Sequence, residues 1–555
     1  MSWFVKILLG LMAFALVVLA LNWANIQRLI RVKSMFDEDK IVHSFSNMSE
    51  NLFSDPLRRS GTEHIWPMAL APLPYTFTDR GTEKFTDTML KELDTTAFIV
   101  VKDGAIVFEE YYKDTGAEDL RISWSMSKSF VSALTGLALA NGDIESLDDP
   151  VTKYVPELKG SAYDGVSLRN VMNMASGIEF DEDYLDPKSD INKMGTALAV
   201  GGSLDKFTAK QKNIARPAGE AWQYCSIDTH VIAMVLRAAT GQSLQDYFVE
   251  NLWSKIGASA DAAYSTDSKG NAFALGGLNV RTRDYALFGE LFRNGGKRGD
   301  VQIIPADWVR ISTTDSAPSA APGNHNSTED GTPFGYGYQW WVPPNSDGEY
   351  FAVGVYGQYI YVNPKAGIVI AKNAAHREFM ETDEKGESYM AQNLTLFREI
   401  AMHYSDWEFG TNTAQVPSVS DQPRLILTAG QSGGCARGSG GCYQTEIYED
   451  GSFYNYVMTR SGEPTKESRG QIDEKLVAAW VNVAESMDFE AFKKTLGPGK
   501  CAGCYDGIDY HFAVLPETKN VGLSSTEASF HDGVEFFTHS SVLLGEVYTN
   551  MAPQE

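Results

Sequence analysis

The order in which strand and helix patterns follow one another constrains the fold of this chain most. Apolar runs over 96–101 and 105–111, joined by the turn residues Lys102-Asp-Gly104, predict a β-hairpin. Helical patterns alternate with loops over 165–310, and strand patterns return at 338–342, 351–353, 359–362 and 368–372. The late strands must rejoin the first hairpin. This order predicts an α+β fold, with one antiparallel sheet flanked by helices and a mainly helical subdomain.

The length of 555 residues exceeds that of one ordinary domain. Residues 410–423 are rich in Thr, Asn, Pro and Ser, which is typical of a linker. Beyond it, a second hairpin pattern over 443–449 and 452–458 precedes an amphipathic run at 474–484. The expected parts are an N-terminal segment (1–26), an extended lead-in (27–80), a main domain (81–409), the linker (410–423) and a small α+β C-terminal domain of unknown function (424–555).

The N-terminal segment has no polar side chain from Ile7 to Leu21, within an apolar stretch of about the length that crosses a bilayer. A cleaved signal peptide is the alternative, but small residues at a cleavage site are not obvious. We therefore expect an uncleaved transmembrane helix that anchors the chain. Arg28, Arg31 and Lys33 follow the segment and would keep the rest of the chain cytoplasmic.

Four cysteines point to the opposite side of the membrane. Cys435, Cys442, Cys501 and Cys504 crowd into the last quarter of the chain, an even number that indicates two disulfides in an oxidising compartment. A zinc site is the alternative for Cys501-Ala-Gly-Cys504, but the spacing of the other pair is too wide for a typical zinc knuckle. We therefore expect a periplasmic or otherwise extracytoplasmic main domain.

Charge and histidine spacing exclude other classes of function. The formal net charge of −25 repels phosphate backbones, which argues against nucleic-acid binding. The nine histidines are scattered without a His-Glu-x-x-His pattern, which argues against a metalloenzyme. We expect no metal and no cofactor.

A serine and a lysine at helical spacing carry the first chemical signal. Ser125-Met-Ser-Lys128 opens an apolar helical pattern that ends at Asn141-Gly142, so the lysine amine can reach the serine oxygen. A serine hydroxyl is a poor nucleophile until a base removes its proton. A lysine can be that base when its amine is neutral. The alternative is a capping serine beside a surface lysine. Ser203-Leu-Asp-Lys206 has the same spacing but no strongly apolar helix, and we interpret it as a chance match.

Two further motifs could complete such a site. Tyr224 and Ser226 precede an apolar helix after a Pro/Gly turn, where a phenol can shuttle protons and the second hydroxyl can bond the lysine or the substrate. Gly354-Val-Tyr-Gly357-Gln358 begins a late strand, and its glycines allow an amide to approach an oxyanion. A tyrosine packed at a helix start and an ordinary strand-edge turn are the alternatives.

As a set, these motifs resemble the serine β-lactamase and penicillin-recognising superfamily, most closely its class C-related esterases and aminohexanoate-dimer (nylon-oligomer) hydrolases. The resemblance covers about 85–405 and also rests on the stretches at 124–130, 168–177, 184–187, 276–289 and 336–341. It implies that Ser125 is acylated, that Lys128 and Tyr224 share the base and acid roles, and that the N–H groups of Ser125 and Gln358 form the oxyanion hole. It also implies that Tyr184 contacts the substrate.

Two departures from the superfamily bear on the substrate. β-Lactamases carry Lys-Thr-Gly where this chain has Val355-Tyr-Gly357, and asparagine where it has Ser226. Both changes favour a small ester or amide without an essential carboxylate. The expected function is serine hydrolysis through an acyl-enzyme. The alternative is a membrane-anchored sensor of penicillin or peptidoglycan fragments that is acylated without turnover. An α/β-hydrolase elbow at Ser432 is rejected because a glycine-rich stretch follows it, not a helix.

Overall fold

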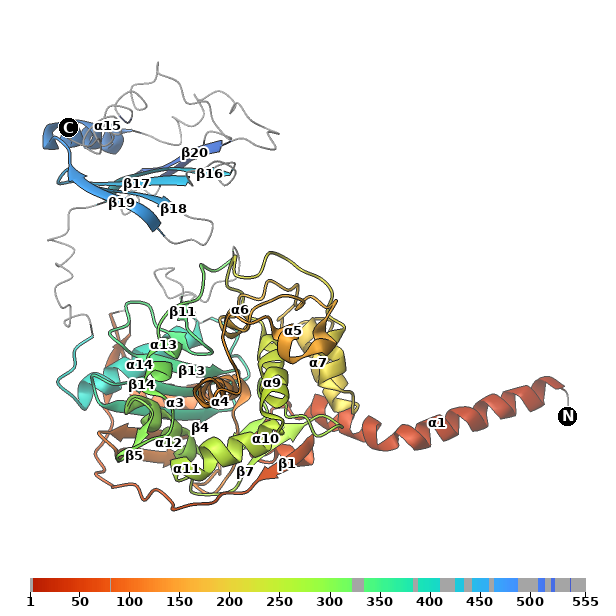
Figure 1. The fold of residues 1–555 in the computed structure, drawn as a ribbon. Helices are drawn as coiled ribbons and strands as arrows, with labels where there is room; N and C mark the ends of the chain where they lie inside the picture. Colours follow the sequence, from red (N-terminus) through yellow and green to blue (C-terminus); the bar gives the residue numbers. More distant parts are fainter. Residues whose placement is uncertain are drawn as a thin grey trace. The chain divides into compact units, whose positions relative to one another are not determined.

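The computed structural model describes residues 3–79, 81–321, 334–382, 388–409, 425–433, 442–458, 464–487, 508–514, 521–524 and 540. The chain divides into two compact units, Met1–Phe409 and Gly410–Glu555. The first unit combines an antiparallel sheet with helices, as the order of the sequence patterns predicts (Figure 1). The linker predicted at 410–423 lies outside the described residues.

The main sheet joins the first hairpin to the late strands. Its order is β11 (Gly335–Tyr336), β12 (Trp341–Val342), β13 (Tyr350–Gly354), β14 (Gln358–Asn363), β15 (Ile368–Ala374), β4 (Thr95–Lys102) and β5 (Ala105–Tyr111). The turn between β4 and β5 places Asp103 and Gly104 at φ 47° and 81°, a left-handed conformation that an Asp-Gly pair tolerates. The predicted hairpin is therefore confirmed, and β4 pairs with the late strand β15.

Helices cover both faces of the main sheet. Successive side chains on a strand point to opposite sides, so neighbouring residues of one strand contact different helices. On β14, Ile360 and Val362 face helix α12 (Thr282–Arg293), where a Cβ on Gly289 would lie 2.8 Å from the Ile360 side chain. On the other face, the rings of Tyr359 and Tyr361 contact Phe397 of α14 (Tyr389–His403). The close approach of α12 explains a glycine within a helix.

A helical subdomain lies beside the sheet. Helix α4 (Ser127–Asn141) packs against α9 (Ser226–Thr240), and α4 ends at Gly142 with φ 82°, a left-handed C-cap (Figure 1). The other helices here are α5 (Val151–Tyr154), η3 (Pro156–Leu158), α6 (Leu168–Met172), α7 (Asp190–Ala199), α8 (Leu204–Ala209), α10 (Leu244–Phe248), η4 (Val249–Trp253), α11 (Ser254–Ile256) and α13 (Ala306–Ser312).

The lead-in, expected to be extended, is instead folded onto this unit. It contains α2 (Ile41–Ser46), η1 (Met48–Glu50) and β1 (Phe53–Leu57), and β1 pairs with β7 (Ala262–Thr266). That second sheet has the order β1-β7-β8-β6, where β8 is Leu278–Val280 and β6 is Arg121–Ile122. The first unit also contains α3 (Thr86–Glu92) and two small hairpins, β2–β3 (Thr76–Asp79, Thr82–Phe85) and β9–β10 (Lys297–Arg298, Val301–Gln302).

Within the membrane anchor predicted at 1–26, the residues from Trp3 onward form the start of one continuous helix, α1 (Trp3–Ser34). Over the described residues, no helix combines the length and the apolar character that a bilayer crossing requires. The structure therefore does not support the transmembrane helix expected from the sequence. The helix continues past the apolar stretch, and the Arg28 guanidinium lies 3.7 Å from the ring centre of Phe53.

The second unit contains a six-stranded antiparallel sheet and helix α15 (Glu474–Ser486). The strand order is β19 (Pro464–Gln471), β18 (Ser452–Met458), β17 (Cys442–Tyr448), β16 (Leu425–Gly433), β20 (Ile508–Val514) and β21 (Val521–Ser524). The predicted hairpin is confirmed as β17–β18. Ser432 lies within β16 and pairs with Asp509 of β20.

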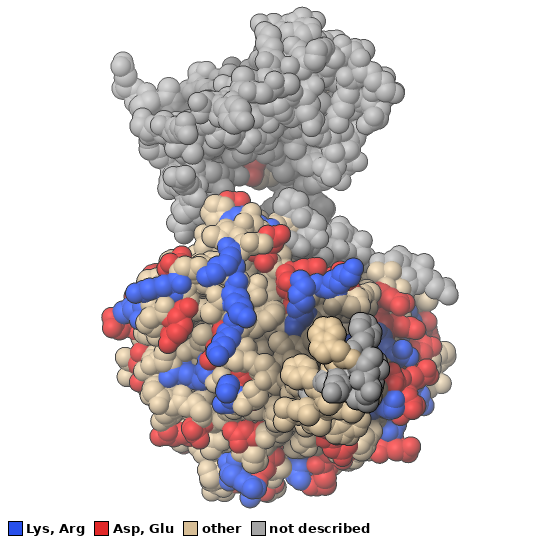
Figure 2. Space-filling model, turned by 90° about the vertical axis from the view of Figure 1, so that its right-hand side faces the viewer, with Lys and Arg blue, Asp and Glu red and all other residues tan. Residues whose placement is uncertain are grey.

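The cysteine predictions fall outside what the structure describes. Cys435, Cys501 and Cys504 are not among the described residues, and Cys442 is described only as the first residue of β17. Disulfides, and the export predicted from them, therefore stay predictions. Basic and acidic side chains are mixed on the face of the molecule that Figure 2 shows, which agrees with the lack of a Lys/Arg-rich run.

Candidate active site

Ser125 lies in a strained turn that follows a short strand. It lies in η2 (Trp124–Met126), a single 3-10 turn between β6 and α4, and so just before the helix in which the sequence placed it. Trp124 has φ 41°, a backbone conformation that is unfavourable for a bulky residue. The backbone N–H of Ser123 donates to Leu278 of β8 at 2.8 Å. The second sheet therefore fixes the approach to the nucleophile turn.

Lys128 lies directly against Ser125. Its Nζ is 2.8 Å from Ser125 Oγ, 3.2 Å from Ser226 Oγ and 3.0 Å from the carbonyl oxygen of Leu275. The side chain is only 1% exposed. Burial lowers the pKa of Lys128 from 10.5 to about 7, while the charge of Glu182 acts in the opposite direction. A substantial fraction of this amine is therefore neutral at neutral pH and can accept a proton.

Tyr224 lies beside both Ser125 and Lys128. Burial raises the pKa of Tyr224, and its hydrogen bond with Ser125 lowers it in part. Its ring stacks on Trp341 with 5.5 Å between centroids, and Lys128 Nζ lies 5.1 Å from the ring centre. The phenol is thus held in its protonated form beside the serine oxygen, where it can donate a proton.

Ser226 and Glu182 extend this network away from the nucleophile. Ser226 is the first residue of α9, and its backbone N–H donates to Glu182 Oε2 at 3.0 Å. The Ser226 hydroxyl donates to Glu182 Oε1, and the Tyr184 hydroxyl donates to the same oxygen at 2.7 Å. Burial raises the pKa of Glu182, while Lys128 lowers it in part. Glu182 is therefore coupled to Lys128 through the hydroxyl of Ser226.

Glu182 was not predicted from the sequence. It stands in a loop rich in acidic residues, 44 positions from Ser226, and nothing in the spacing separates it from Glu179 or Asp183. The Tyr184 hydroxyl bonds Glu182, and its ring lies 6.2 Å from that of Phe379. Its expected contact with a substrate stays a prediction.

The glycine-bearing turn packs against the nucleophile turn. A Cβ on Gly354 would lie 2.4 Å from the Ser123 carbonyl oxygen and 3.1 Å from Ser125 N, so only glycine fits there. Tyr356 and Gly357 have φ 63° and 85°. The side chain of Gln358 is engaged elsewhere, because its Nε2 donates to Ala374 O at 2.6 Å. This leaves its backbone, not its side chain, as the group that can act at the site.

Several other polar residues have structural partners. Ser203 caps α8 by accepting from Lys206 N, so the serine of the second Ser-x-x-Lys pair has a structural role. Cys225 is a buried free thiol, and burial raises its pKa well above the ordinary value. Asp228 accepts from Tyr163 at 2.7 Å, and burial raises its pKa to about 7. Among the described residues, no group of His, Cys, Asp or Glu is arranged to hold a metal ion.

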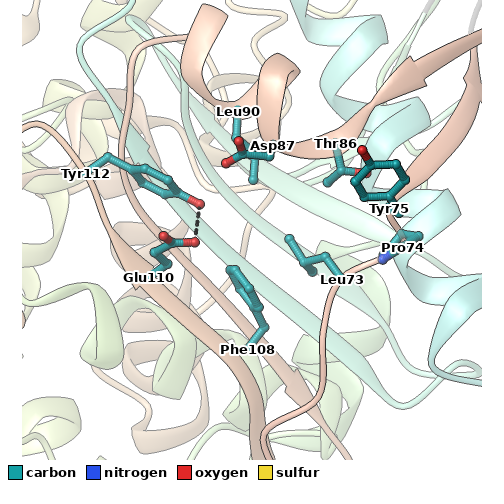
Figure 3. A pocket seen from close by; sticks show the side chains of 9 residues that line it. All are labelled: Leu73, Pro74, Tyr75, Thr86, Asp87, Leu90, Phe108, Glu110 and Tyr112. Carbon is teal, nitrogen blue, oxygen red and sulfur yellow. Dashed lines mark hydrogen bonds between the residues drawn. The ribbon is translucent and has the colours of Figure 1, made fainter.

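A small hollow of about 150 Å³ lies apart from these groups. Figure 3 shows it lined by the lead-in, α3 and β5, with the Tyr112 hydroxyl donating to Glu110 at 2.9 Å. None of the residues that line it belongs to the set around Ser125. We assign it no role.

The fold and the arrangement around Ser125 are those of a serine hydrolase. The chain belongs to the Beta-lactamase family, whose profile matches residues 84–393. The predicted resemblance to this superfamily is therefore confirmed.

Known relatives agree with this assignment. The 6-aminohexanoate-dimer hydrolase of Paenarthrobacter ureafaciens is 30% identical over 290 residues, which cover 51% of this chain and 73% of that protein. A β-lactamase of Pseudomonas fluorescens is 40% identical over 62 residues, 11% of this chain and 17% of that protein. The solved structure of a candidate 6-aminohexanoate-dimer hydrolase from Bacillus anthracis has a TM-score of 0.57 at 24% identity. It covers 66% of this chain and 95% of its own, and it shows the fold alone.

Proposed function

We propose that this protein hydrolyses uncharged esters and small amides through an acyl-enzyme on Ser125. One observation carries the proposal: the Lys128 amine lies 2.8 Å from Ser125 Oγ, and burial lowers the pKa of Lys128 to about 7. An amine with this pKa can take a serine proton near neutral pH and return it later in the cycle.

In the acylation step, Ser125 Oγ forms a bond to the substrate carbonyl carbon while its proton passes to Lys128. The backbone N–H groups of Ser125 and Gln358 are the proposed donors to the resulting oxyanion. The bond from carbon to the leaving alkoxide or amine then breaks. Tyr224 gives the leaving group its proton and regains one from Lys128. In deacylation, water loses a proton to Lys128 and forms a bond to the acyl carbon. The bond from that carbon to Ser125 Oγ then breaks, Oγ regains a proton, and the acid is released.

The turn Val355-Tyr356-Gly357 supports an uncharged substrate. It carries no cation that would attract a carboxylate, and the aromatic ring of Tyr356 occupies the middle position. The relative from Paenarthrobacter ureafaciens is named as a hydrolase of the 6-aminohexanoate dimer, which supports including amides.

Steady-state hydrolysis of p-nitrophenyl acetate tests the proposal. Wild type is compared with Ser125→Ala, Lys128→Ala and Tyr224→Phe. The matched control is the second pair with the same spacing, as Ser203→Ala and Lys206→Ala. We expect kcat/KM to fall by about 10³-fold or more at Ser125 and Lys128 and to stay within about twofold in the control.

Two other results would contradict the proposal. Turnover that survives Ser125→Ala would remove the nucleophile. A single burst of p-nitrophenol from wild type, stoichiometric with protein and without steady-state turnover, would favour the acylated sensor.

A further inference from the structure

The N-terminal segment supplies two phenyl rings to an aromatic cluster beside the nucleophile. Phe36 follows helix α1 and Phe45 lies in α2, and both contact Trp124 and Tyr356. All six pairs among these four residues are in ring contact, with centroid distances from 5.2 to 6.2 Å. We call this set the four-ring cluster. Phe36 and Phe45 precede the residues matched by the Beta-lactamase family, 84–393.

The other two rings belong to strained turns that carry the proposed oxyanion donors. Trp124, with φ 41°, immediately precedes Ser125, and Tyr356, with φ 63°, is two residues before Gln358. A bulky side chain at positive φ is energetically unfavourable and persists only where the surrounding packing holds it. The four-ring cluster provides that packing at both turns at once.

The same N-terminal segment is attached to the unit at further points. Strand β1 extends the sheet whose strand β6 leads directly into Ser125. The Arg377 guanidinium lies 3.5 Å from the carboxylate of Glu38, and the backbone N–H of His376 donates to Tyr356 O. These contacts hold Phe36 and Phe45 in register with the two turns.

We propose that Phe36 and Phe45 are positioning residues for the oxyanion hole. They hold Trp124 and Tyr356 so that the N–H groups of Ser125 and Gln358 converge on one point. The inference rests on the proposed function, and it makes the N-terminal segment part of the catalytic machinery, although the two rings act only through their neighbours. Oxyanion donors must stay within hydrogen-bond distance of the developing charge, and a misplacement of about 1 Å costs about 100-fold in rate.

The test uses the full chain with p-nitrophenyl acetate. Phe36→Ala and Phe45→Ala are expected to lower kcat by about 10- to 100-fold and to change KM by less than about twofold, because the lost interaction acts in the transition state. Phe36→Tyr keeps the ring and should retain kcat within about threefold. Inhibition by phenylboronic acid, whose tetrahedral adduct places an oxygen in the oxyanion hole, should weaken in proportion to kcat/KM. Phe85→Ala is the control, since it removes the exposed ring of the Tyr75–Phe85 pair.

Three results would overturn the inference. If Ser125→Ala is inactive but Phe36→Ala and Phe45→Ala keep the wild-type kcat, the positioning role is refuted. The proposed function then still holds. If the wild-type protein shows no turnover that requires Ser125, the proposed function is refuted and this inference with it. If the alanine variants lose their melting transition, Phe36→Leu replaces them. A lower kcat with an intact transition then supports the inference, and an unchanged kcat refutes it.

Discussion

The carboxylate of Glu182 accepts hydrogen bonds from both the backbone N–H and the hydroxyl of Ser226. Since Ser226 Oγ also lies 3.2 Å from Lys128 Nζ, a negative charge stands two hydrogen bonds from the proposed base. That charge favours the ammonium form of the lysine and partly opposes the effect of burial on its pKa. Glu182 and burial therefore shift the pKa of Lys128 in opposite directions.

Glu182→Gln is expected to move the acidic limb of the pH–rate profile to lower pH. The amide carries no charge, so the pKa of Lys128 falls further below its ordinary value. The amide also presents an N–H to one of the two Ser226 donors, and we expect kcat to fall by about tenfold from the broken bonds. The measurement is kcat/KM for p-nitrophenyl acetate from pH 5 to 9. The exposed Glu179→Gln in the same loop is the control, and a limb that stays in place in Glu182→Gln would contradict the coupling.

In the wild-type enzyme, the acidic limb should reflect Lys128 itself. Only the neutral amine accepts the serine proton, so kcat/KM is expected to rise with pH up to about 7, the lowered pKa of Lys128, and to level off above it. Lys128→Arg should lose about 10³-fold in activity or more, because a guanidinium stays charged at these pH values.

Two other buried groups have a pKa near 7 and must be excluded as the source of this limb. Lys372 bonds Asn393 at 2.8 Å, and Asp228 bonds Tyr163. Lys372→Met and Asp228→Asn are expected to leave the midpoint of the acidic limb unchanged. A midpoint that disappears in either variant would assign the titration to that residue.

The local patterns of the sequence predicted the parts of the fold that depend on neighbours in the chain. The Asp-Gly hairpin, the apolar helix after Ser125 and the late strands are examples. The strand predicted at 338–342 is reduced to Trp341–Val342, because Gln339 has φ 65° and its side chain bonds Thr229 and the Met172 carbonyl. Those partners are more than 100 residues away, and no periodicity reveals them.

The candidate site divides in the same way. Ser125 and Lys128 are three residues apart and could be predicted from helical spacing. The contacts of Phe36 with Tyr356 join residues 320 positions apart and depend on the complete fold. Sequence spacing therefore identifies the reacting groups, whereas the groups that hold them in place emerge only from the structure.

Gly354→Ala should inactivate the enzyme without unfolding it. The added methyl would lie 2.4 Å from the Ser123 carbonyl oxygen and 3.1 Å from Ser125 N, so the nucleophile turn must move. We expect kcat to fall by about 100-fold, the cost of a shift of about 1 Å, while fluorescence and circular dichroism keep a cooperative melting transition. Gly116→Ala, where a Cβ meets nothing within 4 Å, is the matched control. Wild-type kcat in Gly354→Ala would contradict the close approach of the two turns.

Lys128→Met is expected to stabilise the first unit while it inactivates the enzyme. The pKa of Lys128 is about 7 in the folded chain and near its ordinary 10.5 in the unfolded chain. Between these values the unfolded chain binds a proton that the folded chain does not, so the lysine opposes folding, and this opposition diminishes as pH rises toward 10.5. Methionine has a similar length and no charge to bury. We expect its melting temperature at pH 7 to exceed that of wild type by about 2–4 °C, which corresponds to roughly 1 kcal/mol, and the difference to vanish toward pH 10. Lys206→Met, at the exposed lysine of the second pair, should show no such pH-dependent difference. A Lys128→Met variant that melts below wild type at pH 7 would mean that the hydrogen bonds of the amine outweigh the free energy of its burial.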